Sequence, residues 1–220
     1  LFNSINNLTI IPVSNWLNNQ LKHSFFNNYH SKVIHNGVDL KVFKRSEGKT
    51  FDESYNLQNK FILLGVASVW TQRKGFYEFI KLRALLGEEF AIVLVGVNKK
   101  LQKKLPKNII SIQRTSNQAN LAELYSCSDL YLNLTFEDTY PSTNLESIAC
   151  GTPVVTYKTG GSPESVDSGG GFIVNQGDIS ALVDRIKKIK NNEEPRISQE
   201  SLRKIASDKF DKDNNFIHYL

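Results

Sequence analysis

Residues 135–166, TFEDTYPSTNLESIACGTPVVTYKTGGSPESV, decide the fold of this chain. The apolar run at 130–134 in front of them predicts a buried strand that leads into an acidic loop containing a proline. A short helical pattern follows and ends at Gly151 and Pro153, and residues 154–157 predict the next strand. The stretch is therefore a strand, a loop, a helix and a second strand in close succession.

The loop in this unit has the features of a ligand site. Open α/β sheets bind ligands where the carboxyl end of a parallel strand leads into a helix. The start of that helix offers free N–H groups and the positive end of a dipole, which suit a phosphate. Glu137, Asp138 and Glu146 surround the helix start, and their carboxylates can accept hydrogen bonds from hydroxyl groups. A phosphate combined with many hydroxyls describes a nucleotide sugar.

The rest of the chain alternates between apolar runs and helical patterns. Further strands are expected at 8–13, 32–39, 61–68, 90–96, 108–113 and 171–174. Helices are expected from Ser14, as N-cap, through Phe25, and at 75–86, 121–127, 179–189, 202–210 and 216–220. Strands that are apolar throughout and separated by helices indicate a parallel sheet covered on both faces. The expected fold class is a Rossmann-like α/β domain.

The signature stretch resembles that of the family 4 glycosyltransferases, which are retaining enzymes with the two-domain GT-B fold. That family carries two glutamates separated by seven residues, then a helix of small residues and a Cys-Gly-x-Pro-Val-Val turn. Asp138 stands at the first acidic position here and Glu146 at the second, while Glu137 is one residue out of register. Whether Asp138 or Glu137 does the work of the first glutamate is left open. The form EDTYPSTNLE is similar to bacterial enzymes of polysaccharide or colanic-acid-type assembly.

The resemblance covers nearly the whole chain and implies a division into parts. Residues 1–30 would be the end of an N-terminal acceptor domain that is otherwise missing, and residues 31–59 the connection between the domains. Residues 60–200 would form the donor-binding Rossmann-like domain, the C-terminal half of a GT-B fold. Residues 201–220 would return as helices toward the N-terminal domain. The chain contains no Met, which predicts that it is the downstream part of a longer protein.

Lys74 is the expected electrophilic residue. A lysine before a glycine at a helix start can neutralise a diphosphate leaving group as the glycosidic bond breaks. The resembled family pairs this lysine with an arginine six residues upstream, where this chain has Ser68, while Arg73 lies beside the lysine. Arg73 either compensates for Ser68 or leaves the diphosphate more loosely held. Without the distal signature, two solvated loop cations would be the simpler interpretation.

Glu146 has two interpretations. Its carboxylate can accept hydrogen bonds from the ribose 2′- and 3′-hydroxyls, a geometry that suits a cis-diol. The segment Thr143-Asn144-Leu145-Glu146 also fits a capping box, in which Glu146 would bind the N–H of Thr143. The residues alone leave the two level, and the resemblance favours ribose binding.

Other residues are expected to contact the donor. The backbone around the helix start would bind the diphosphate and sugar, and the loop after the third strand of the Rossmann-like domain would meet the nucleobase. A glycine pair beyond the next strand permits close backbone approach or forms an ordinary turn, and Glu164 can favour a helix N-terminus. The expected donor-binding residues are Glu137, Tyr140, Ser142, Thr143, Asn144, Arg114, Thr115, Gly160 and Gly161.

Composition excludes several classes. The four histidines lack metal-ligand spacing, so neither a metal nor any other cofactor is expected besides the donor substrate. No apolar run approaches the roughly 20 residues that span a membrane, and no motif supports nucleic-acid binding. The net charge of +5 includes lysine clusters at 99–107 and 187–190, which are expected to be solvated helix faces or to contact an anionic membrane. The expected location is the cytoplasm, including the inner face of the membrane.

The sequence therefore predicts the donor-binding part of a glycosyltransferase that acts in bacterial surface polysaccharide synthesis on a glycan or lipid-linked acceptor. This part alone is expected to transfer no sugar. Two alternatives remain open. One is a nucleotide-sugar-binding module without catalysis, which the Asp138 and Ser68 departures favour. The other is a different GT-B activity, such as a sugar-nucleotide epimerase or a phosphorylase.

Overall fold

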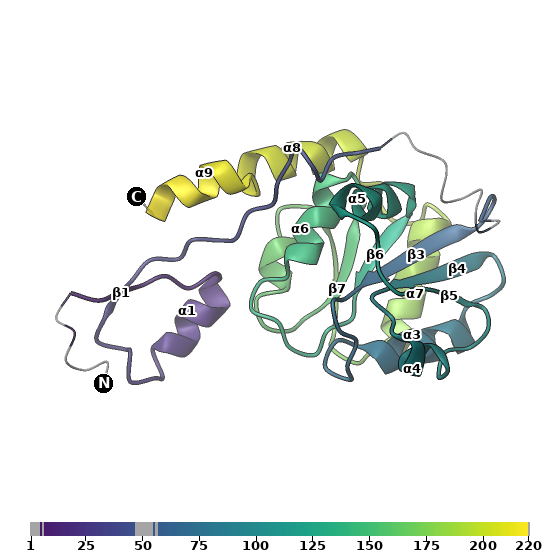
Figure 1. Cartoon of the computed structure of the whole chain (residues 1–220), viewed down its shortest axis with the longest axis horizontal. Coiled ribbons are helices and arrows are strands. Elements are labelled where there is room, and N and C mark those ends of the chain that lie inside the picture. Colours follow the sequence, from purple (N-terminus) through teal and green to yellow (C-terminus); the bar gives the residue numbers. More distant parts are fainter. Residues whose placement is uncertain (1–4, 6, 47–54, 56, 220) are drawn as a thin grey trace.

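The structure is a computed structural model that describes residues 5, 7–46, 55 and 57–219 (Figure 1). Its main sheet has six strands, all parallel, in the order β5-β4-β3-β6-β7-β8. The chain moves outward from β3 to one edge, returns to β6 beside β3, and then moves to the other edge. This is the order of a doubly wound Rossmann sheet, so the fold expected from the sequence is confirmed. The strands are β3 (Phe61–Val66), β4 (Phe90–Val95), β5 (Ile109–Ile112), β6 (Leu130–Asn133), β7 (Val154–Tyr157) and β8 (Gly171–Val174).

The central strands are buried on both faces, which explains their continuous apolar sequences. Every residue of β4, β6 and β7 is buried. Successive residues of β3 alternate between two cores, so that Ile62 and Leu64 belong to one and Leu63 to the other. Each such side chain contributes about 1.5–3 kcal/mol when removed from water. Helices therefore have to cover both faces of the sheet.

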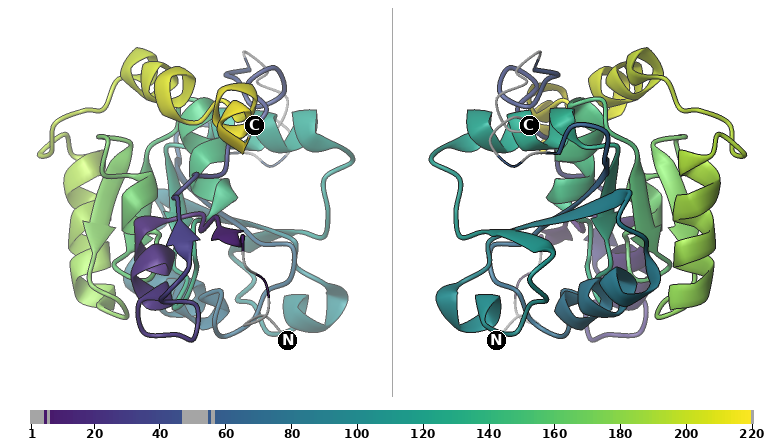
Figure 2. Two further views of the ribbon diagram at one scale, coloured as in Figure 1. Left: turned by 90° about the vertical axis from the view of Figure 1, so that its left-hand side faces the viewer. Right: turned by 90° about the vertical axis from the view of Figure 1, so that its right-hand side faces the viewer.

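Two layers of helices do so (Figure 2). One core contains residues of α5, α6 and α8, and the other contains residues of α3 and α7. The short α4 carries two of the exposed lysines of the 99–107 cluster. The helices are α3 (Phe76–Leu85), α4 (Lys99–Gln102), α5 (Gln118–Cys127), α6 (Ser142–Ala149), α7 (Ile179–Lys190) and α8 (Gln199–Lys209), with a 3-10 turn, η2 (Pro163–Ser165), between β7 and β8.

A small unit lies before the main domain. The strands β1 (Thr9–Ile10) and β2 (His30–Ser31) pair in parallel around α1 (Asn15–Leu21), for which Ser14 is the N-cap as expected. The helix ends at Leu21 and not at Phe25, because the Ser24 hydroxyl donates to the Leu21 carbonyl at 2.8 Å and accepts from the Phe26 N–H at 3.1 Å. Such local side-chain bonds compete with a helical backbone.

The prediction of a strand at 32–39 is wrong. In this segment only Val38 forms a bridge, with Asp211, and the short strand β2 lies just before it. The backbone of Val38 is instead bound to the C-terminal part of the chain, with its N–H donating to the Phe210 carbonyl at 2.7 Å. The linker expected at 44–58 lies largely outside the described residues.

The C-terminal helices hold this connecting segment. Arg203 on α8 donates to the carbonyls of Phe43 at 2.9 Å and Leu40 at 3.0 Å, and also to that of Ala149 at the end of α6. After α8 the chain forms α9 (Lys212–Phe216) and the 3-10 turn η3 (Ile217–Tyr219), rather than the single helix expected at 216–220. In Figure 1 these helices run past α6 and extend over the small N-terminal unit.

Candidate functional site

A cavity of about 660 Å³ opens at the carboxyl ends of the central strands. It lies at the switch point between β3 and β6, where the chain direction across the sheet reverses and where doubly wound sheets bind ligands. Its walls come from the ends of β3, β4, β5 and β6, from the start of α6 and from the connecting segment. The residues used below that line it are Asn36, Ser68, Lys74, Arg114, Thr115, Asp138, Tyr140, Ser142, Thr143 and Glu146.

The loop after β3 is folded so that Lys74 faces this cavity. The buried Trp70 donates from its indole N–H to the Val95 carbonyl at 2.8 Å and fixes the start of the loop. The backbone N–H of Lys74 donates to the Thr71 hydroxyl at 3.2 Å. Gly75 then has a positive φ of 78°, and a Cβ there would lie 2.2 Å from the Leu134 carbonyl oxygen. Gly75 is thus required for the loop to pack directly against the end of β6.

The acidic loop after β6 is fastened to the lysine loop. The Phe136 N–H donates to the Arg73 carbonyl at 2.7 Å, and the Arg73 guanidinium donates to the Glu137 carbonyl at 3.0 Å. Thr135 adds hydroxyl bonds to the carbonyls of both Arg73 and Glu137. Arg73 itself is exposed and lies outside the cavity lining. It holds the two loops together, which is a different position from the ligand-facing one expected for it.

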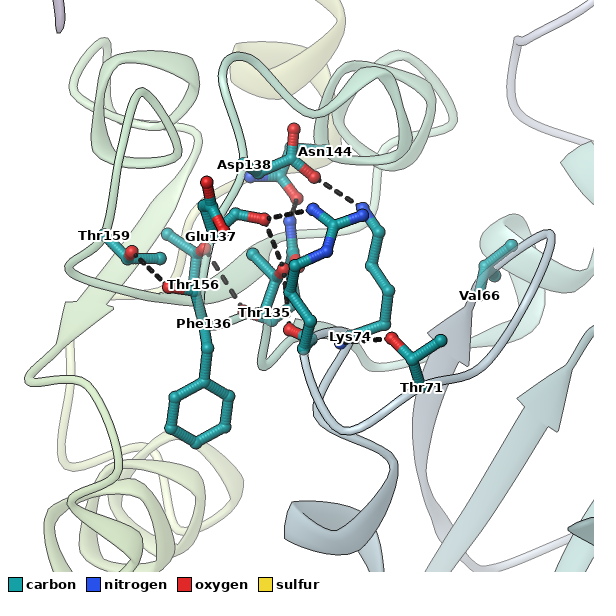
Figure 3. Close-up of polar contacts among 12 residues, drawn as sticks. Val66, Thr71, Lys74, Thr135, Phe136, Glu137, Asp138, Asn144, Thr156 and Thr159 are labelled. Atoms are coloured by element: carbon teal, nitrogen blue, oxygen red, sulfur yellow. Dashed lines mark hydrogen bonds and ion pairs between the residues drawn. The ribbon is translucent and has the colours of Figure 1, made fainter.

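Lys74 and Asp138 form an ion pair inside the cavity. Their Nζ and Oδ2 atoms are 2.6 Å apart, and Figure 3 shows the two side chains reaching toward one another from the two loops. The neighbouring Glu137 is exposed and does not line the cavity. Of the two candidates for the first acidic position, Asp138 is therefore the one whose carboxylate faces a ligand.

Glu146 projects from α6 into the same cavity. Its Oε2 accepts a hydrogen bond from the Tyr125 hydroxyl at 3.0 Å. Burial raises the pKa of Glu146, and hydrogen bonds from the Tyr125 and Ser142 hydroxyls act in the opposite direction. Burial also raises the pKa of Tyr125 well above its usual range, with the Glu146 charge adding to the effect, so Tyr125 stays a donor. Its hydroxyl fixes the orientation of the carboxylate.

The interpretation of Glu146 as part of a capping box with Thr143 is wrong. The helix begins at Ser142, with Pro141 as N-cap in an extended conformation, so Thr143 lies within the first turn and not at the cap. Pro141 supplies no side-chain hydrogen bond to the helix start. Ser142 and Thr143 line the cavity, so the start of α6, whose first N–H groups have no partner within the helix, lies at its edge.

Asn144 lies outside the cavity lining. Its side chain is fully buried, accepts from the Asn133 amide at 2.9 Å and donates to the Ser165 hydroxyl at 2.7 Å. These bonds join β6, α6 and η2 behind the site. The direct donor contact expected of Asn144 does not fit this position, and its contribution is to hold α6 in place.

Gly160 and Gly161 also lie outside the cavity lining. Gly160 has a φ of 53°, and a Cβ on it would lie 1.9 Å from the Asp138 carbonyl oxygen. A Cβ on Gly161 would meet the Thr139 carbonyl at 1.8 Å and the Ser14 side chain at 2.9 Å. The close backbone approach expected of the pair is therefore made within the protein, between the Asp138 loop and the start of α1.

Two residues near the cavity come from the connecting segment and were not expected from the sequence. Asn36 lines the cavity, and the His35 ring stacks on that of Tyr140 with centroids 4.7 Å apart. Asn followed by Gly is typical of a tight turn, but nothing local in the sequence indicates that this turn meets the acidic loop. Arg114 and Thr115 follow β5 and line the cavity as expected.

Glu164 binds the start of α1. Its carboxylate accepts from the backbone N–H groups of Trp16 at 2.7 Å and Asn15 at 2.8 Å, and from His35 at 3.3 Å. Burial alone would raise the pKa of Glu164, but these hydrogen bonds outweigh it and hold the pKa below its usual value. Glu164 thus stabilises a helix N-terminus, as expected, but the helix is α1, about 150 residues away in the sequence.

Within the described part of the chain, no group of three or more His, Cys, Asp or Glu side chains is arranged to hold a metal ion. The helices among the same residues were also compared with the length and apolarity that crossing a membrane requires, and none meets them.

Comparisons with known proteins find related chains. The chain is 26% identical over 207 residues to the N-acetyl-alpha-D-glucosaminyl L-malate synthase of Bacillus anthracis, covering 86% of this chain and 54% of that protein. It is 22% identical over 175 residues to the capsular polysaccharide biosynthesis glycosyltransferase CapM of Staphylococcus aureus, covering 73% and 45%. The chain thus spans about half the length of these curated relatives.

Among solved structures, Anabaena HepE in complex with UDP-glucose superimposes with a TM-score of 0.83 at 20% identity, over 98% of this chain and 63% of that one. This likeness concerns the fold. Residues 48–208 match the family described as glycosyl transferases group 1, which is most of the chain and includes every wall of the cavity except Asn36. The chain therefore belongs to the glycosyl transferases group 1 family.

Proposed function

We propose that this chain is the donor-binding part of a retaining glycosyltransferase, which transfers a sugar from a nucleoside-diphosphate sugar to a glycan or lipid-linked acceptor in bacterial surface polysaccharide synthesis. One observation carries the proposal. Lys74, Asp138, Glu146 and the uncapped start of α6 converge on one cavity at the switch point of a Rossmann sheet. A cation, two carboxylates and free N–H groups are the set that a diphosphate flanked by two hydroxyl-bearing rings requires.

The diphosphate would bind between α6 and Lys74. The N–H groups and dipole at the start of α6 favour an anion, and Ser142 and Thr143 line the cavity there. The ammonium of Lys74 would neutralise charge that develops on the leaving diphosphate as the glycosidic bond breaks. Both groups are held before the reaction begins, so little reorganisation is needed.

The ribose would bind at Glu146. A carboxylate can accept from two adjacent hydroxyls at once, and the Tyr125 hydroxyl keeps that of Glu146 in a fixed orientation. The nucleobase would then lie toward Arg114 and Thr115 at the end of β5, on the other side of the cavity from Asp138 along the sheet edge.

The donor sugar would lie near Asp138 and Tyr140, on the far side of the diphosphate. In a retaining transfer of this type, the nucleoside diphosphate departs and the acceptor hydroxyl attacks on the same face of the sugar. No protein nucleophile and no metal is then required of these residues. The acceptor would be bound by a further domain, so this chain alone is expected to transfer no sugar from donor to acceptor.

The comparisons support the two halves of the proposal differently. The Anabaena HepE complex contains UDP-glucose and has the same fold, which supports a nucleotide sugar as the donor class. The name of the Staphylococcus aureus relative refers to capsular polysaccharide biosynthesis, which supports the surface polysaccharide role.

The test is calorimetric titration of this chain with UDP, GDP and ADP, repeated with a chelator. At least one should bind, with affinity that the chelator leaves unchanged. Absence of binding to all three would overturn the proposal, and loss of binding with the chelator would overturn the metal-independent form of it.

A second candidate is a nucleotide-sugar-binding module without catalysis. Ser68 lines the cavity at the position where the resembled family has an arginine, which favours this candidate. Assays of a protein that joins this chain to an acceptor domain separate the two, since sugar transfer would eliminate the binding module.

A further inference from the structure

The ion pair between Lys74 and Asp138 occupies the point where the proposed donor would place both its diphosphate and its sugar. The Lys74 side chain is 31% exposed and the Asp138 side chain 15% exposed, so both are partly shielded from water. The two loops are fixed to one another by the Phe136 to Arg73 backbone bond and by the Arg73 to Glu137 bond. The contact in Figure 3 is therefore built into the loops and does not depend on a chance meeting of two flexible side chains.

This geometry creates a conflict for a bare nucleoside diphosphate. Its phosphates would have to bind Lys74 beside the Asp138 carboxylate, and two like charges at such a distance repel one another. The carboxylate would also lose part of its hydrogen bonding to the ammonium, and a shielded carboxylate without a partner is costly. A nucleotide that carries a sugar avoids this cost, because the sugar hydroxyls can donate to Asp138 while the diphosphate takes Lys74.

We propose that Asp138 is a specificity-determining residue that discriminates between the nucleotide sugar and the bare nucleoside diphosphate. In the empty cavity it holds Lys74 and lowers the affinity for the diphosphate product. When a donor binds, its sugar hydroxyls replace the ammonium as the partner of Asp138. The residue thereby favours donor binding and product release. This inference rests on the proposed function, since it takes Lys74 as the diphosphate ligand.

The chain offers a matched control in the adjacent carboxylate. Glu137 carries the same charge one residue away, but it is exposed and lies outside the cavity lining. Removing its charge changes the net charge of the loop by the same amount as removing that of Asp138, without changing the partner of Lys74. A comparison of Asp138→Asn with Glu137→Gln therefore separates the ion pair from the net charge.

The experiment is titration of the wild-type chain and both variants with UDP, GDP and ADP and with the corresponding glucose nucleotides. Asp138→Asn should bind the bare diphosphate about 3- to 20-fold more tightly, the effect of a partly buried pair. Its affinity for the glucose nucleotide should not rise, so the preference for the sugar-bearing form falls. Glu137→Gln should change both affinities by less than about twofold, as expected for an exposed charge.

A second comparison uses Lys74→Met, which removes the ammonium but keeps an apolar stem of similar length. In that background, adding Asp138→Asn should raise diphosphate affinity by less than it does when Lys74 is present, because only the repulsion is relieved and there is no ion pair to release. An equal gain with and without Lys74, or unchanged diphosphate affinity in Asp138→Asn, would overturn this inference alone. Failure of the wild-type chain to bind any of the three diphosphates would overturn the proposed function, and the inference with it.

Discussion

Helices α1 and α6 begin on either side of the same stretch of backbone, but their N-termini are satisfied in opposite ways. At the start of α1, the Ser14 hydroxyl accepts from the Leu17 N–H at 3.1 Å, and the Glu164 carboxylate accepts from the N–H groups of Asn15 and Trp16. At the start of α6, Pro141 supplies no side-chain bond and the first turn faces the cavity. The loop with Gly160 and Gly161 separates the two helix starts.

The difference distinguishes a structural contact, at the start of α1, from a candidate binding site, at the start of α6. The anion that a helix start attracts is supplied at α1 by the protein itself, so this terminus fastens the small N-terminal unit to the main domain. At α6 we propose that the anion is supplied by a ligand. Changes at the two helices should therefore separate stability from nucleotide affinity.

The largest effect is expected from Glu146→Gln. Loss of the charged acceptor should weaken nucleotide binding by about 1.5–3 kcal/mol, the range for a charge-assisted hydrogen bond. The fold should lose little stability, because Gln keeps the size of the side chain and removes a charge that burial disfavours. Calorimetric titration and the urea midpoint measure the two quantities. Unchanged affinity would refute the ribose assignment of Glu146.

A somewhat smaller effect, on stability and not on nucleotide affinity, is expected from Glu164→Ala. The loss of a carboxylate that binds two helix N–H groups should destabilise the docking of α1 by about 1–2 kcal/mol, with little change in nucleotide affinity. Hydrogen exchange at the amides of Asn15 and Trp16 reports the docking. The control is Asp167→Ala, an exposed carboxylate in the same loop. Equal exchange in the two variants would show that α1 is held by other contacts.

Lowering the pH should affect Glu146 and Glu164 in different pH ranges. The pKa of Glu146 is raised, so protonation of its carboxylate, and with it the loss of nucleotide affinity, should begin above the usual pH range of a glutamate. The pKa of Glu164 is lowered, so its contribution is complete above its unfolded value and is lost only as the pH falls through the lower folded value. Titrations and hydrogen exchange between pH 7 and about 4 should therefore show affinity falling first. Loss of both at the same pH would contradict this order, and Glu146→Gln should flatten the affinity profile.

The smallest effect is expected from Ser14→Ala. Removal of an N-cap hydroxyl typically costs about 1 kcal/mol, and the cost should be toward the lower end here because Glu164 still binds two neighbouring N–H groups. The change should appear as faster exchange of the Leu17 amide, with nucleotide affinity equal to that of the wild-type chain. A loss of nucleotide affinity would mean that the contact at the start of α1 and the cavity are coupled.

The sequence predicts the sheet well because its strands are buried on both faces and read as continuous apolar runs. It also predicts that Lys74, Asp138 and Glu146 lie close together. Each belongs to the segment after a strand whose carboxyl end reaches the same edge of the sheet. Asn144 could not be separated from Ser142 and Thr143 by residue type. Its burial depends on Asn133 and Ser165, which only the folded chain brings to it.

Two further errors concern the segment 32–39 and the capping box at Thr143. Residues 32–39 contain enough apolar residues for a strand, but the bridging partner of Val38 is Asp211 at the other end of the chain. The Thr143 capping box has the right spacing, but Pro141 already occupies the N-cap and shifts the register of the helix. A distant partner decides the structure of the first segment, whereas a neighbouring proline decides where the helix of the second begins.

The attachment of the connecting segment to the C-terminal helices has a consequence for biosynthesis. Arg203 grips carbonyls that precede it by 160 or more residues, and Val38 bridges to a residue beyond α8. All six strands of the main sheet are translated before these partners emerge from the ribosome. The nascent sheet and the Glu164 contacts with α1 can therefore form first, whereas the carbonyls of Leu40 and Phe43 gain their Arg203 partner only when the last helices are released. Closure of so long a loop is slow compared with local folding, so attachment of the connecting segment to the C-terminal helices is expected to be a late step in the folding of this chain.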